Sequence, residues 1–169
     1  MFFLLALCLD ALAVPAATFV AEALGQVDRD AARLVAARCV RLSVLASVAT
    51  GAVTVAVAPL LPRLFSDEPD VRRAATVALI ACGLFQPFAG QAFAFDGVLL
   101  GAGDFVALRR AMLLALVPFA VPAALTLWLR WPGIAGVWLA LGCWLAARAF
   151  LLGRRWRAES WLPATAPTG

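Results

Sequence analysis

Asp96 is the side chain whose surroundings point most directly to chemistry. It lies in AFAFDGVLLGAGD, residues 92–104, among Phe, Ala, Val and Leu. A charge at the centre of a bilayer costs about 2.5–3.5 kcal/mol, so a carboxylate kept in such a run is a functional candidate. We predict that Asp96 binds a proton or Na⁺; the alternative is an interfacial carboxylate that reaches water. Asp10 is the second predicted ion- or proton-binding residue, and Arg148 is predicted to be structural and to reach the interface.

Polar and small residues lie on both sides of Asp96 in the same apolar run. Gln86 and Gln91 are predicted to line a substrate cavity, and Pro87 removes a backbone hydrogen bond beside them. Glycines recur every seven residues and end in a G-x-x-x-G pair, a pattern that lets another helix backbone approach closely. The sequence therefore predicts a helix-packing face at Gly83, Gly90, Gly97 and Gly101.

The GAGD sequence at residues 101–104 raises a catalytic alternative. G-x-G-D is the signature of intramembrane aspartyl proteases, in which two aspartates activate a water molecule, and Asp10 would then be the second carboxylate. A simpler interpretation is favoured, in which the two glycines end one helix and Asp104 caps the next. We therefore predict that the protein is not an enzyme.

Composition indicates that these residues lie in a membrane protein. Of the 169 residues, 64% are apolar and 14% are charged, whereas soluble domains have about 45–50% and about 25%. The basic residues are all Arg and lie at the ends of apolar runs, so the net charge of +4 does not indicate a nucleic-acid partner. There is no His, and the cysteines are widely spaced, so we predict no metal site, no disulfide framework and no cofactor; the cysteines are Cys8, Cys39, Cys82 and Cys143.

Five apolar runs can each cross the roughly 30 Å hydrocarbon core as a helix of about 20 residues. The predicted fold class is an all-α integral membrane protein, with spans near residues 2–24, 42–62, 74–100, 106–129 and 134–153. Arg33, Arg38 and Arg41 stand among apolar residues between the first two spans, which favours a helical start that lies at the membrane surface before it turns inward. We predict one helical bundle over residues 1–157 and a disordered cytoplasmic tail over 158–169.

The placement of arginine predicts the orientation of the spans. Nine arginines fall on one side of the membrane: Arg29, Arg33, Arg38, Arg41, Arg109, Arg110, Arg154, Arg155 and Arg157. The other side has four: Arg63, Arg72, Arg73 and Arg130. Because arginine accumulates on the cytoplasmic side, the C-terminus is predicted to be cytoplasmic and the N-terminus outside. An outside N-terminus without a signal sequence leads us to expect that a preceding helix is missing.

Three stretches resemble the C-terminal lobe of multidrug and toxic compound extrusion (MATE) transporters, closest to the DinF-like branch. They are LDALAVPAATFVAEALGQVD, LPRLFSDEPDVRRAATVAL and FQPFAGQAFAFDGVLLGAGD, and the similarity runs from about residue 2 to about residue 157. The resemblance implies that the five spans are the eighth to twelfth of twelve helices. Asp96 then matches a tenth-helix acid that contributes to a cation site in some branches, and Asp10 matches an eighth-helix acid. The family's G-x-G-D turn is altered here, with Val27 in place of Gly.

By this resemblance the chain is the C-terminal portion of an antiporter that exports drugs or organic cations in exchange for H⁺ or Na⁺ across the cell membrane. Its expected partners are the lipid bilayer, amphipathic or cationic small molecules, and a missing N-terminal lobe in the same or a separate chain. Alternating access needs two lobes, so we expect Met1 to be an internal start or a truncated reading frame. The alternatives are a non-transporting remnant or assembly subunit and, less favoured, the aspartyl protease.

Overall fold

The computed structural model describes residues 2–128 and 133–162, and all the regular structure in these ranges is helical. The five α-helices are long and apolar enough to cross a membrane, which confirms the predicted fold class. A short 3₁₀ helix follows the second of them. In chain order the elements are α1 (Phe2–Gly25), α2 (Arg29–Val57), η1 (Leu61–Leu64), α3 (Pro69–Gly101), α4 (Phe105–Trp128) and α5 (Gly133–Arg157).

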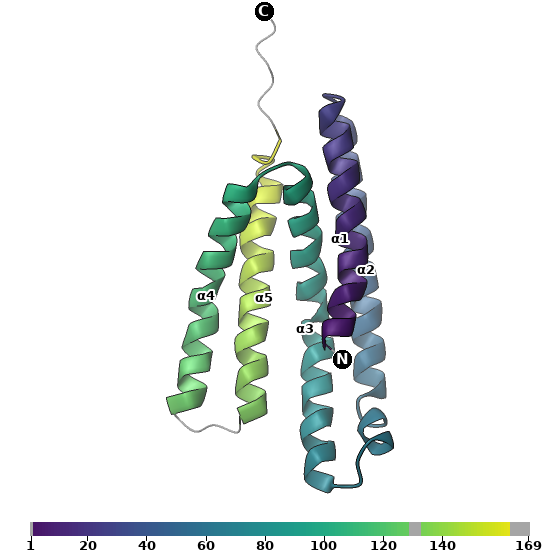
Figure 1. The fold of residues 1–169 in the computed structure, drawn as a ribbon, viewed down its shortest axis with the longest axis vertical. Helices are drawn as coiled ribbons and strands as arrows, with labels where there is room; N and C mark the ends of the chain where they lie inside the picture. Colours follow the sequence, from purple (N-terminus) through teal and green to yellow (C-terminus); the bar gives the residue numbers. More distant parts are fainter. Residues whose placement is uncertain (1, 129–132, 163–169) are drawn as a thin grey trace, which may run out of the picture.

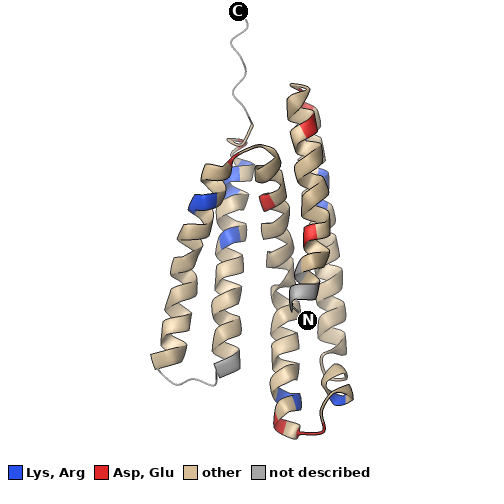
Figure 2. Ribbon diagram, in the orientation of Figure 1, with Lys and Arg blue, Asp and Glu red and all other residues tan. Residues whose placement is uncertain are grey.

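The helices form an up-and-down bundle with α3 at its centre (Figure 1). α3 packs against α1, α2 and α5, while α4 lies at the outer edge and packs mainly on α5. The α1–α2 turn, the α3–α4 turn and the end of α5 meet at one end of the bundle. We call this the arginine-rich end, because the start of α2, the start of α4 and the end of α5 carry the nine arginines grouped above. Figure 2 shows charged residues gathered toward the two ends of the bundle.

The two turns at the arginine-rich end are built alike. Residues 25–28, GQVD, join α1 to α2, and residues 101–104, GAGD, join α3 to α4. In each turn the third residue has positive φ, +59° at Val27 and +72° at Gly103, and the aspartate amide donates to a carbonyl five residues earlier. Each aspartate side chain then accepts a hydrogen bond from the third residue after it, at 2.9 Å for Asp28 and 3.2 Å for Asp104.

The segment after the first turn differs from the prediction. Residues 29–41 do not turn before the second span; they are the first part of α2, which runs without interruption from Arg29 to Val57. Ala32 and Ala36 are fully buried and belong to the same core cluster as Val20 and Ala23 of α1. This part of α2 therefore packs along α1, and its arginines occupy the remaining faces of one continuous helix.

The C-terminal boundary also lies later than predicted. Trp161 and Leu162 are buried and belong to the core cluster, so the packed part of the chain extends past residue 157. The Trp161 indole N–H donates to the Trp156 carbonyl at 3.2 Å. The predicted tail is therefore packed as far as Leu162, and its remaining residues, 163–169, lie outside the described part of the chain.

The glycines of α3 lie at close contacts with two helices. A Cβ atom on Gly83 would come within 2.8 Å of the Gly51 carbonyl oxygen, and one on Gly90 would overlap Ser47, both on α2. A Cβ on Gly97 or Gly101 would instead overlap backbone atoms of α1. The glycine face of α3 thus packs against α2 in its N-terminal part and against α1 in its C-terminal part.

Candidate ion site at the meeting of three helices

Asp96 and Arg148 form an ion pair between α3 and α5. An Nη2–H of Arg148 donates to Oδ2 of Asp96. The Asp96 side chain is 22% exposed and that of Arg148 is 7% exposed. The prediction that Arg148 reaches the interface is therefore wrong, because its guanidinium turns inward to the carboxylate of the neighbouring helix.

The Arg148 guanidinium stacks on the ring of Trp144. The guanidinium carbon of Arg148 lies 4.8 Å from the centre of the Trp144 ring, one helical turn earlier on α5. Oδ1 of Asp96 and Nε of Arg148 are both buried without a hydrogen-bond partner in residues 2–128 and 133–162. A buried charged group is normally fully hydrogen-bonded, so these atoms leave unused capacity for a further ligand.

Asp10 lies on the α1 side of the same region. Its side chain is exposed, and it is close enough to Asp96 for the two carboxylates to repel each other. The Asp10, Asp96 and Arg148 side chains together carry a formal charge of −1, and guanidinium does not release its proton in proteins. One bound proton or monovalent cation would bring these three groups to neutrality.

The two glutamines do not share a cavity. Gln86 is 2% exposed and packs against Gly51 of α2, and its side-chain nitrogen finds no partner among the described residues. Gln91 lies on another face of α3, where it lines a cavity of about 320 Å³ against α5. Four aromatic side chains line that cavity together with small residues and Arg157; the aromatic residues are Phe88, Phe95, Phe150 and Trp156. The five-residue spacing explains the difference, since five residues turn a helix by roughly 500°, or 140° net.

Both carboxylate oxygens of Asp104 have structural partners. Oδ1 caps α4 through the amide of Ala107, and Oδ2 accepts from Nε of Arg155 at 2.7 Å. This is the arrangement expected of a capping residue rather than of a protease aspartate that shares a proton with a second carboxylate. Within the described residues no group of three His, Cys, Asp or Glu side chains could hold a metal ion.

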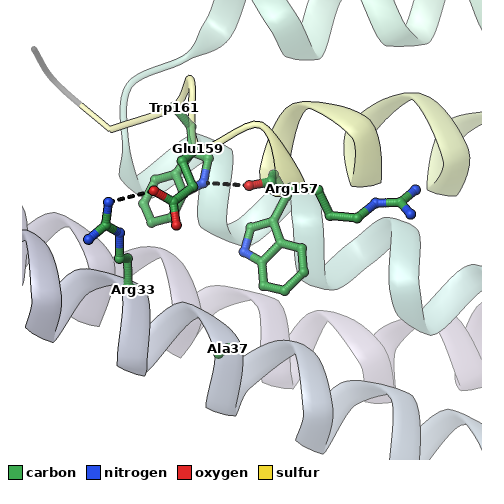
Figure 3. Close-up of a pocket in the computed structure, with 6 residues that line it drawn as sticks. Arg33, Ala37, Arg157, Glu159 and Trp161 are labelled. Carbon is green, nitrogen blue, oxygen red and sulfur yellow. Dashed lines mark hydrogen bonds and ion pairs between the residues drawn. The ribbon is translucent and has the colours of Figure 1, made fainter.

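A second cavity of about 290 Å³ lies at the arginine-rich end, between α2 and the segment that follows α5 (Figure 3). Arg33 of α2 pairs there with Glu159 at 2.5 Å and with Asp30 at 3.0 Å. Arg157 extends away from Glu159 in this view. The cavity therefore lies where the C-terminal segment packs on α2. The Arg33 guanidinium that points into it already has two carboxylate partners.

The pairing of Asp96 with Arg148 is not predicted from the sequence. The two residues are 52 positions apart, so no local spacing connects them. A usable signal was present nonetheless. Both are charges inside apolar spans, and each costs less in a membrane when the other neutralises it.

Comparison with protein families matches residues 1–126 of the chain to the MatE family. The match covers α1, α2, α3 and nearly all of α4, including Asp10 and Asp96, and it stops before Arg148. No curated protein and no solved structure matches the chain.

Proposed function

Because the chain belongs to the MatE family, whose members are transporters, we propose that it is the C-terminal portion of a secondary antiporter of the DinF-like branch. It exports amphipathic or cationic compounds in exchange for H⁺ or Na⁺ across the cell membrane. Its arginine-rich end faces the cytoplasm, in keeping with the accumulation of arginine on that side. A complementary N-terminal lobe supplies the opposite wall of the transport pathway.

The observation that carries this proposal is the charge balance between α1, α3 and α5. Two carboxylates and one permanent cation leave one negative charge in a largely apolar region. An exchangeable cation removes that charge, and its departure restores it. Arg148 keeps one carboxylate paired throughout, so the site takes up one positive charge at a time.

Organic cations and the coupling ion compete for this single negative charge. A site that is neutral with H⁺ or Na⁺ bound has no electrostatic attraction for a cationic compound, and the emptied site does. Such mutual exclusion is the requirement for exchange, provided that the site opens alternately to the two sides of the membrane. The aromatic cavity beside Gln91 offers apolar surface for the body of an amphipathic compound.

The test is gradient-driven efflux of ethidium from proteoliposomes that hold this chain together with the N-terminal half of a MatE-family transporter. Asp96→Asn should abolish efflux driven by either a proton or a sodium gradient. Asp70→Asn is the matched control, because Asp70 is an exposed carboxylate in the first turn of the same helix. It should leave efflux within a factor of two.

Unchanged efflux by the Asp96→Asn protein would refute the role of Asp96 and leave that residue structural. If the native chain gives no efflux with the complementary half, the transport proposal fails. The alternative of a non-transporting remnant or assembly subunit would then account for the chain. Fluorescence-detected size exclusion before each assay shows that the compared variants are equally folded.

A further inference from the structure

A groove between α4 and α5 opens at the arginine-rich end of the bundle. Its volume is about 270 Å³, and it is separate from the cavity of Figure 3. Asp104, Arg110 and Arg155 line its charged part. Apolar side chains, among them Leu114 and Leu151, line the rest. The groove therefore combines cationic groups with a hydrocarbon surface.

The charged part of the groove contains an arginine, Arg110, that has no carboxylate partner among the described residues. Arg155 is paired with Asp104 through Nε, which leaves its terminal N–H groups available, and its side chain is 40% exposed. Arg110 is exposed and has no ion pair or hydrogen-bond partner among the described residues. The three side chains sum to +1, so the groove favours an anion. In the cavity of Figure 3, by contrast, Arg33 is already paired with two carboxylates.

The apolar part lies deeper than the cationic part. Leu114 follows Arg110 by four residues along α4, so it lies about 6 Å further from the arginine-rich end. Leu151 precedes Arg155 by the same spacing on α5, which runs in the opposite direction. α4 is the outermost helix, and Leu114 is 58% exposed. A ligand that fits this order has a negative head at the level of the arginines and a hydrocarbon chain that descends between the helices.

We propose that this groove binds an anionic phospholipid, with its phosphate between Arg110 and Arg155 and an acyl chain along Leu114 and Leu151. Guanidinium groups match the geometry of phosphate oxygens, and basic pockets between transmembrane helices on the cytoplasmic side suit such headgroups. Lipid binding of this kind rests on the orientation proposed above, with the arginine-rich end at the cytoplasmic face of the membrane. It does not depend on transport.

Native mass spectrometry of the full chain, released from detergent with dioleoyl phosphatidylglycerol or dioleoyl phosphatidylcholine, measures the binding directly. Phosphatidylglycerol should bind more tightly than phosphatidylcholine. Arg110→Gln should weaken phosphatidylglycerol binding about fivefold, which is the factor for a contact of about 1 kcal/mol. Arg109→Gln is the matched control, because it removes the same charge from the adjacent exposed residue, which does not line the groove. It should change binding by less than twofold.

Several results would overturn the proposal. Equal losses in the Arg110→Gln and Arg109→Gln proteins would mean that the lipid responds to diffuse surface charge. Equal binding of the two lipids to the native chain would show that the headgroup is not selected. Displacement of phosphatidylglycerol by inorganic phosphate at about 10 mM would show that the groove binds free anions instead of lipid. A dimer that dissociates in the Arg110→Gln protein would show that a second copy covers the groove.

Discussion

Removing one member of the Asp96–Arg148 pair should destabilise the bundle, whereas removing both should not. Breaking a buried ion pair costs about 3–5 kcal/mol because the remaining charge is left uncompensated. Arg148→Met leaves the Asp96 carboxylate beside Asp10 without a cation, so we expect a loss of about 3–5 kcal/mol in the free energy of unfolding. Asp96→Asn leaves Arg148 stacked on Trp144, a contact worth up to about 2 kcal/mol, so we expect a smaller loss of about 2–3 kcal/mol.

The double variant, Asp96→Asn with Arg148→Met, should lie within about 1 kcal/mol of the native chain, since replacing a whole buried pair by uncharged groups is often neutral. Equilibrium unfolding in micelles of rising dodecyl sulfate fraction, followed by the fluorescence of the six tryptophans, measures all three free energies. The control is Asp67→Asn, which breaks the pair between Asp67 and Arg72, whose side chains are 105% and 36% exposed. An exposed pair contributes less than about 1 kcal/mol.

Two results would refute this reasoning. If both single variants matched the exposed-pair control, the Asp96–Arg148 pair would contribute no more than a surface contact. If the double variant lost the sum of the two single losses, the side chains would stabilise the bundle independently, and the uncompensated charge would not be the cause.

Three further predictions concern packing and backbone. Val27→Gly should raise the free energy of unfolding by about 0.5–1 kcal/mol, because Val27 has positive φ and is 85% exposed, so glycine relieves strain without loss of packing; an unchanged value would contradict the strain. Gly97→Ala should cost about 1–3 kcal/mol through overlap with the Ala13 backbone, whereas Gly25→Ala, with open space around it, should cost under about 1 kcal/mol in the same assay. Trp161→Ala should cost about 3–5 kcal/mol, since Trp161 is 4% exposed; a loss below about 1 kcal/mol would show that the C-terminal segment is detached.

The helices, apart from the bounds of α2, were predictable because the determinants are local. Apolar runs of sufficient length fixed the five spans, and Asp104 was correctly expected to cap a helix after two glycines. The grouping of arginines was also predictable from their positions along the sequence, since the nine counted together do lie in the elements that meet at one end of the bundle. None of these inferences needed knowledge of which helices touch.

The errors arose where the outcome depends on helix contacts. The first part of α2 looks like a surface helix because Arg33, Arg38 and Arg41 interrupt it, but Ala32 and Ala36 on another face pack against α1. The paired state of Arg148 depends on α5 lying beside α3. The burial of Gln86 depends on α2 occupying that face. A single sequence shows the periodicity within each helix, but it does not show which other helices that helix contacts.

The separation between Asp96 and Arg148 has a consequence for biosynthesis. Their 52-residue spacing means that, at about 5–20 residues per second, Asp96 is added to the chain roughly 3–10 seconds before Arg148. During that interval the partners available to α3 are α1 and α2, both already synthesised. The glycine contacts with these two helices can therefore hold α3 in the bilayer before any charge is neutralised. When α5 inserts, Arg148 can pair at once with the Asp96 carboxylate, which is already in place on α3.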